Sequence, residues 1–151
     1  MTTLTDEKIQ HKLLNKASGK DEGIRNGEVA KFLFQHLEQY GDALNDIQKA
    51  IDYVFNKAGG LVVVQSVNSN ITGVVVINET GMGGYIPENI LVYIAMDRKY
   101  RGKGLGKMLM EHAIEECDGD IALHVEKDNP ARFLYEKLGF TNPYLEMRLK
   151  R

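Results

Sequence analysis

The segment 100–107, YRGKGLGK, constrains this chain most, because its three glycines alternate with long, mostly cationic side chains between two apolar stretches. The stretch before it, 90–96, is typical of a buried strand. The stretch after it predicts a helix with Leu105, Leu109 and Ala113 on one side. Glycines let a backbone approach a ligand closely, and the N–H groups at a helix start favour an anion. The segment therefore predicts a turn that binds pyrophosphate, with a flexible loop of solvated lysines as the alternative.

Two common nucleotide-binding motifs are excluded by their spacing. The phosphate-binding loop of the NTPases could take its Gly-Lys pair from residues 106–107, but its first glycine would then fall on Arg101 and its hydroxyl residue on Met108. The dinucleotide fingerprint could begin with the glycines at 102 and 104, but its third glycine would fall on Lys107. A different kind of phosphate site is therefore expected.

The rest of the chain divides into a helical half and a half that alternates strands with helices. Three apolar stripes at helical spacing precede residue 58: one at Ile9, Leu13 and Leu14, one over 29–40 and one over 43–55. Strands are predicted at 61–66, 71–78, 90–96, 121–125 and 144–149, and a second helix is predicted from Pro130 to about Leu138. This order predicts an α/β (α+β) fold, a mixed sheet with helices on its faces.

With 151 residues, the chain has the length of one domain, and we expect a helical part over about 1–58 and a core of sheet over about 60–151. The net charge of -2 gives no general attraction to nucleic acid or to an acidic membrane surface. No apolar run is long enough to span a membrane, and residues 1–10 lack the apolar core of a signal peptide. These absences lead us to expect a cytoplasmic protein.

Metal and disulfide sites are not expected either. Cys117 is the only cysteine, so no disulfide framework or thiolate metal cluster is predicted. His11, His36 and His112 do not have the spacing of metal ligands.

The glycine-rich segment resembles the acetyl-CoA loop of the GNAT superfamily of N-acetyltransferases. That loop reads Gln/Arg-x-x-Gly-x-Gly/Ala, a pattern met by Arg101, Gly104 and Gly106, although the family usually has a proline where Arg98 stands. A second segment, 128–140 (DNPARFLYEKLGF), is similar to the late helix of the family with its Tyr-Glu-x-Leu-Gly-Phe ending. The two motifs occur in the family's order, and the resemblance covers about 61–140.

The resemblance implies a GNAT-like sheet, mixed and mostly antiparallel, twisted, with helices on both faces. It also implies transfer of an acetyl group from acetyl-CoA to a primary amine of a small molecule or a protein by direct attack, without a metal. In such a site the amides of Ile94 and Met96 bind the pantetheine arm at a splay between two strands, and the amides of 102–107 bind the pyrophosphate. The implied cofactor-binding residues are Ile94, Ala95, Met96, Arg101, Gly102, Lys103, Gly104, Leu105, Gly106, Lys107, Asn129 and Tyr135.

Tyr135 is the candidate general acid. A phenol with a pKa near ~10 is a workable proton donor to a thiolate whose parent thiol has a pKa near ~8.5. The alternative is that its ring only packs in a helix interface. The base that deprotonates the amine stays open among Glu88, His124, Glu126 and water.

Two alternatives to an enzyme also fit the sequence, a non-catalytic acyl-CoA-binding regulatory module and a plain interaction domain. After Phe140 only 141–151 remain, enough for one strand, which predicts an acceptor site that is open on this side. An exposed sheet edge would then need cover from the N-terminal helices or from a second copy in a homodimer.

Overall fold

A computed structural model describes residues 8–56 and 59–151, and one five-stranded sheet forms its centre. The strands follow one another across the sheet in chain order. The first four are antiparallel neighbours, and the fifth is parallel to the fourth. The predicted mixed, mostly antiparallel sheet is therefore confirmed. The strands are β1 (Ile9–Leu14), β2 (Gly60–Val67), β3 (Asn70–Glu79), β4 (Asn89–Met96) and β5 (Ile121–Leu123).

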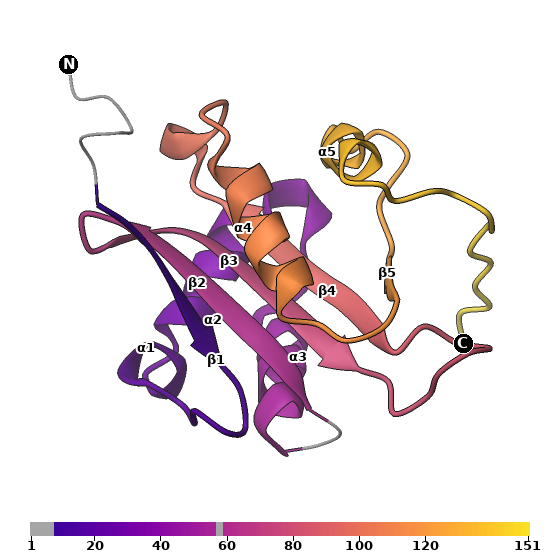
Figure 1. The fold of residues 1–151 in the computed structure, drawn as a ribbon, viewed down its shortest axis with the longest axis horizontal. Coiled ribbons are helices and arrows are strands. Elements are labelled where there is room, and N and C mark those ends of the chain that lie inside the picture. The colour runs from indigo at the N-terminus through magenta and orange to yellow at the C-terminus, as the bar shows by residue number, and fades with distance from the viewer. Residues whose placement is uncertain (1–7, 57–58) are drawn as a thin grey trace.

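Helices cover both faces of this sheet, as predicted (Figure 1). One face carries α1 (Glu22–Arg25), α2 (Glu28–His36) and α3 (Leu44–Asn56), and the other carries α4 (Leu105–Glu115) and α5 (Ala131–Lys137). Two short 3-10 turns, η2 (Glu38–Tyr40) and η3 (Arg98–Tyr100), follow α2 and β4. Among the described residues, no helix has the length and apolar character needed to cross a membrane.

The sheet separates two apolar clusters, because neighbouring side chains of a strand point to opposite faces. Val62 packs with Ile47 on the face of α1–α3, whereas Val63 packs with Leu109 on the face of α4 and α5. All four side chains are fully buried. Burial of each contributes about 1.5–3 kcal/mol relative to exposure. The long valine runs of β2 and β3 thus hold helices on both sides.

The helix predicted around Ile9 and Leu14 is wrong, because these residues form β1. The strand pairs with β2 from Ile9 opposite Val67 to Leu14 opposite Val62. Leu13 packs on the face of α4, and Leu14 packs on the face of α1–α3. A few apolar residues in so short a stretch fit both the helical repeat and the two-residue repeat of a strand. The unpaired backbone groups along the edge of β2 then favour the strand, because β1 can form hydrogen bonds with them.

The strand predicted over 144–149 is also wrong, since the structure assigns no regular element after Phe140. Tyr144 is 84% exposed and Met147 is 91% exposed. The neighbouring edge strand, β5, ends at Leu123 instead of the predicted Val125, so it offers few backbone partners. A short edge provides few hydrogen bonds to offset the entropy of ordering another strand.

Candidate active site

β4 and β5 form a fork, which is the central feature of the site (Figure 1). Their parallel pairing is limited to Asn89–Leu91 of β4, whereas β4 remains paired with β3 as far as Met96. Val92 is an extra residue of β4, since Leu91 lies opposite Ile77 and Tyr93 lies opposite Val76. This bulge twists β4 where the pairing with β5 ends. The outer edge of β4 beyond it has no strand neighbour in the described chain.

Two backbone amides point into the fork. The amide of Asp97 donates to the carbonyl of Thr72 in the β3 segment over 2.9 Å. Backbone groups alternate in direction along a strand, so the N–H groups of Ile94 and Met96 point away from β3. The predicted splay is therefore present, with these amides on its open side and Ala95 between them buried toward the face of α1–α3.

The glycine-rich turn presents a row of unpaired N–H groups. Gly102 (φ 79°) and Gly104 (φ 80°) adopt the left-handed conformation, which other residues rarely take. No backbone N–H group of 102–107 donates to another described residue, and α4 starts at Leu105 without a side-chain cap. The ammonium groups of Lys103 and Lys107 have no carboxylate within ion-pair distance in the described parts of the chain. These groups together suit a polyanion such as a pyrophosphate.

The predicted cofactor-binding elements meet at Gly106. A Cβ atom added to this glycine would lie 3.6 Å from Cγ of Met96 and 3.8 Å from Cδ2 of Leu134. The start of α4, the end of β4 and the middle of α5 are therefore in contact. Tyr135 follows Leu134 and packs in the same apolar cluster.

Tyr135 is buried, with 7% of its surface exposed. Its ring centroid lies 6.0 Å from that of Phe140, at an angle of 59°. The hydroxyl group makes no hydrogen bond to any residue that the structure describes. Burial raises the pKa of Tyr135 to about 12. The phenol is therefore protonated at neutral pH and has a proton to donate, while its ring also fills the packing role that was the alternative.

The side chain of Arg101 forms hydrogen bonds within the protein. Its Nη2 donates to the carbonyl of Met96 (3.1 Å) and to the carbonyl of His36 (3.2 Å). Glu38 lies 3.8 Å from Nη1 of Arg101 and accepts a 2.5 Å hydrogen bond from Nη2 of Arg98. Arg98, which stands where the family usually has proline, thus joins Arg101 in fixing the end of α2 to the exit of β4.

Asn129 caps α5. Its Oδ1 accepts a hydrogen bond from the amide of Ala131 over 2.9 Å, and the helix begins at Ala131, one residue later than predicted. The Nδ2 group of Asn129 has no partner among the described residues, so it remains a free donor at the start of α5.

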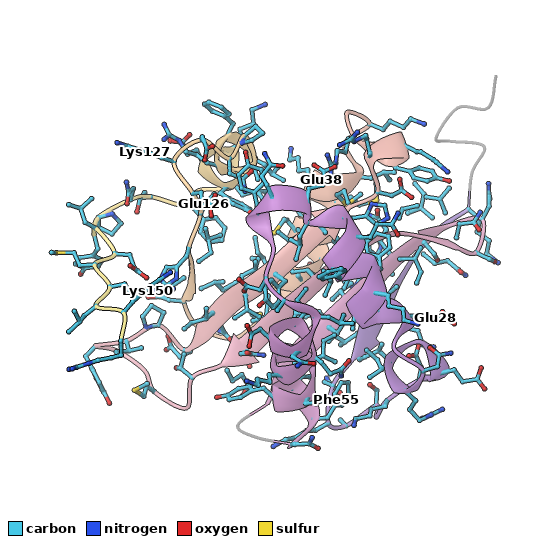
Figure 2. All side chains as sticks on the ribbon, turned by 180° about the vertical axis from the view of Figure 1, so that it is seen from behind. Glu28, Glu38, Phe55, Glu126, Lys127 and Lys150 are labelled. Atoms are coloured by element: carbon cyan, nitrogen blue, oxygen red, sulfur yellow. The ribbon has the colours of Figure 1, made fainter. Side chains whose placement is uncertain are left out.

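The three candidate bases lie in different places. Glu88 precedes the first residue of β4 and accepts a hydrogen bond from the amide of Asp120 (3.1 Å). It is six residues from Ile94, which is about 20 Å along a strand. His124 directly follows β5 at the fork and is exposed, and Glu126 is exposed on the loop before α5 (Figure 2). The structure thus brings His124, but not Glu88, to the fork.

The segment 36–42 forms a third wall of the site and carries no motif that would identify it from the sequence. Tyr40 donates from its hydroxyl to the carbonyl of Asp128 (3.4 Å), and Asp42 accepts a 2.5 Å hydrogen bond from the hydroxyl of Tyr93 on β4. Burial and the Asp42 carboxylate raise the pKa of Tyr93. The segment therefore runs along β4 on the face of α2 and α3, with Glu38 and Glu126 at the same end of the molecule (Figure 2).

Comparisons with known proteins agree with this architecture. The sequence matches the acetyltransferase (GNAT) family over residues 30–140. A 5-NmdU N-acetyltransferase of Pseudomonas phage PaMx11 is 32% identical over 102 residues, which cover 66% of this chain and 69% of the phage protein. The cysteine-rich protein 2-binding protein of Mus musculus is 35% identical over 54 residues, which cover 35% of this chain but only 7% of that much longer protein.

Solved structures share the fold. The ribosomal-protein-S18-alanine N-acetyltransferase of Escherichia coli has a TM-score of 0.68 at 20% identity, covering 91% of this chain and 80% of that one. The aminoglycoside N-acetyltransferase AAC(6')-Iy in complex with CoA has a TM-score of 0.65 at 13% identity, covering 96% and 95% of the two chains. The family match spans most of the chain, from α2 to the end of the late motif. The chain therefore belongs to the GNAT family of acetyltransferases.

Proposed function

We propose that this enzyme transfers the acetyl group of acetyl-CoA to a primary amine of a small molecule or a protein. The observation that carries the proposal is the row of unpaired N–H groups over 102–107 beside the open edge of β4. A pyrophosphate at the turn and an extended pantetheine arm along β4 would satisfy both sets of groups. The fold shared with an enzyme solved with CoA supports this assignment.

In this proposal the backbone supplies most of the contacts to acetyl-CoA. The N–H groups of 102–107 and the positive end of α4 bind the pyrophosphate, and Lys103 and Lys107 add charge. The amides of Ile94 and Met96 bind the pantetheine arm and the acetyl carbonyl. A hydrogen bond to that oxygen stabilises the negative charge that develops on it during attack. The free Nδ2 of Asn129 is a further donor for the pantetheine arm.

The chemical step joins the amine nitrogen to the acetyl carbon and breaks the bond from that carbon to sulfur. Tyr135 then gives its proton to the departing thiolate, which leaves as the free thiol of CoA. Burial raises the pKa of Tyr135 to about 12 and so makes the phenol a weaker acid, and the same burial raises the proton affinity of a thiolate that forms beside it. The buried hydroxyl has no competing partner among the described residues, which favours transfer to a ligand.

The amine must approach from the face of α2 and α3, because the turn at 102–107 and Tyr135 lie on the opposite face. Leu123 and Val125 pack toward α4 and α5, so the alternation of side chains directs His124, between them, to the acceptor side. We assign His124 as the group that takes the proton of the amine, directly or through water. Glu88 is too far along β4 for this role.

The experiment that tests the proposal is an acetylation assay over a panel of small amines and peptides, with CoA release and product mass as readouts. Release of CoA that requires an amine and yields an N-acetylated product is the expected result. Binding of acetyl-CoA without product from any amine would instead favour a non-catalytic acyl-CoA-binding module. Absence of acetyl-CoA binding would contradict the proposal.

A further inference from the structure

Gln65 of β2 is fully buried and lies on the face of α4. Its Nε2 donates to the backbone carbonyl of Leu105 over 2.9 Å and lies 3.0 Å from Nε2 of His11. Its Oε1 accepts a hydrogen bond from the hydroxyl of Thr72 over 2.9 Å. One side chain thus joins β1, β3 and the first residue of α4.

The partners of Gln65 fix the orientation of its amide. The carbonyl of Leu105 only accepts, so the atom facing it must be the NH₂ group, and the hydroxyl of Thr72 then matches the amide oxygen. The second N–H group requires His11 Nε2 to be an unprotonated acceptor. The His11 ring stacks on His112 of α4, with centroids 4.7 Å apart. Burial and the neighbouring His112 lower the pKa of His11, which favours the neutral ring that this arrangement needs.

The hydrogen bonds of Gln65 hold both ends of the glycine-rich segment in place. Leu105 is the first residue of α4, whose N-terminus has no side-chain cap. Thr72, whose hydroxyl binds Gln65, accepts the amide of Asp97 with its carbonyl, directly after β4. The segment between Asp97 and Leu105 is therefore anchored to one buried group at each end. The turn itself is exposed, so these anchors decide where its free N–H groups point.

We propose that Gln65 is a positioning residue for acetyl-CoA, which holds the start of α4 so that the amides of 102–107 converge on the pyrophosphate. The proposal rests on the function proposed above. Gln65 touches no ligand in it and acts only through Leu105 and Thr72. Loss of the Gln65 side chain should therefore weaken the binding of acetyl donors that carry a pyrophosphate, such as acetyl-CoA. The binding of acetyl donors that lack a pyrophosphate should not change.

The test compares Gln65→Met, which keeps the volume but removes the hydrogen bonds, with a matched control. Asn78→Leu removes a similar bond, because Nδ2 of Asn78 donates to the carbonyl of Ala50 in α3 over 3.1 Å, on the other face. Dissociation constants are measured for acetyl-CoA and for acetyl-pantetheine. Gln65→Met should raise the dissociation constant of acetyl-CoA by about tenfold or more, the equivalent of one lost buried hydrogen bond. The same variant should change the dissociation constant of acetyl-pantetheine by less than about twofold. Asn78→Leu should leave both constants unchanged.

Equal weakening of both donors by Gln65→Met, or no weakening of acetyl-CoA, would overturn the proposal. If that variant does not fold, Thr72→Val removes the hydroxyl that donates to Oε1 of Gln65 (2.9 Å) and lies 3.3 Å from the Gln65 backbone carbonyl. It should show the same selectivity with a smaller loss of acetyl-CoA affinity, about threefold. If Thr72→Val weakened the binding of acetyl-CoA and of acetyl-pantetheine equally, that result would also overturn the proposal.

A second readout separates this proposal from the proposed function. The amide of Met108 is bound to the carbonyl of Gly104 over 3.1 Å, so its hydrogen exchange reports the first turn of α4. Gln65→Met should accelerate this exchange in the free protein, and Asn78→Leu should not. If the wild-type protein bound both donors equally, the pyrophosphate site would be wrong, and the exchange of Met108 would still decide whether Gln65 positions the turn.

Discussion

The guanidinium of Arg101 donates to the carbonyl of Met96 over 3.1 Å, at the last residue of β4. This carbonyl faces the open edge of the strand, as the amide of the same residue does. Arg101 therefore closes the edge at one end and leaves the amides of Ile94 and Met96 as the groups available to a ligand. The side chain acts on the shape of the edge, and its charge is directed to Glu38 instead of a phosphate.

Two substitutions of Arg101 should show whether its hydrogen bonds or its charge support the binding of acetyl-CoA. Arg101→Ala should weaken acetyl-CoA by about fivefold, because the end of β4 and the end of α2 lose their shared donor, worth about 1 kcal/mol at this half-exposed position. Arg101→Gln keeps an N–H donor and should stay within about twofold of the wild type. Isothermal titration measures the affinity of both variants for acetyl-CoA. If Arg101→Gln bound acetyl-CoA as weakly as Arg101→Ala, the effect would be due to the charge of Arg101.

Gly104→Ala should lower both stability and acetyl-CoA affinity. The left-handed backbone at φ 80° costs a residue with a Cβ about 1–2 kcal/mol, although no atom within 4 Å would clash with that Cβ. Relief of this strain would turn the amides of the following residues away from the ligand, so we expect at least a tenfold loss of affinity, or about 1.4 kcal/mol.

The control for this variant is Gly19→Ala, at φ 81° and equally open, in the segment between β1 and α1. Thermal unfolding and acetyl-CoA titration of both variants form the test. Both should lose a few degrees of melting temperature, about 2–4 °C per kcal/mol, and only Gly104→Ala should lose affinity. Equal affinity in the two variants would remove the glycine turn from the binding site.

Tyr135→Phe should lower kcat by about 10²–10⁴ and leave acetyl-CoA binding and stability unchanged. The hydroxyl binds no described residue, so its removal breaks no hydrogen bond of the fold. Tyr144→Phe, at a tyrosine that is 84% exposed, serves as the control and should keep full turnover. Steady-state rates with an accepted amine provide the measurement, and full turnover in Tyr135→Phe would leave Tyr135 with a packing role alone.

The stability of the protein should decrease at mildly acid pH because of His11. Burial and His112 lower the pKa of His11 in the folded state below its value of about 6.5 in an unfolded chain. The unfolded chain therefore binds more protons as the pH falls below about 6.5, and the free energy of unfolding falls until the folded pKa is passed.

His11→Gln, which keeps a side-chain acceptor for Gln65 without a titratable ring, should reduce this slope. Urea unfolding at pH 7.5 and 5.5 compares it with His124→Gln, a change at an exposed ring. A slope that is the same in His11→Gln and in the wild type would show that other groups cause the loss.

Local sequence signals predicted most of the fold, including the glycine-rich turn before α4 that we propose binds acetyl-CoA. The valine runs of β2 and β3 and the glycine turn before α4 have strong local patterns, and the structure has these elements within a residue or two. β1 was predicted as a helix because three apolar residues do not define a period, and its pairing with β2 joins residues more than 45 positions apart.

The parts of the site that could not be predicted depend on tertiary contacts. Asp42 meets Tyr93 across 51 positions, and Gln65 meets Leu105 across 40. Neither pair has a motif, and each residue alone is an ordinary turn or strand residue. Glu88 and His124 stay candidate bases in the sequence, and only the pairing of β4 with β5 shows which of them lies beside the fork.

In the function proposed above, the sheet that separates two apolar clusters also separates the two substrates. The start of α4 and Tyr135 lie on one face of the sheet, and the amine approaches from the face of α2 and α3. Substitutions that are far apart and share no partners have nearly additive effects. Under this proposal, substitutions on the amine side should change the choice of amine and leave the affinity for acetyl-CoA nearly unchanged.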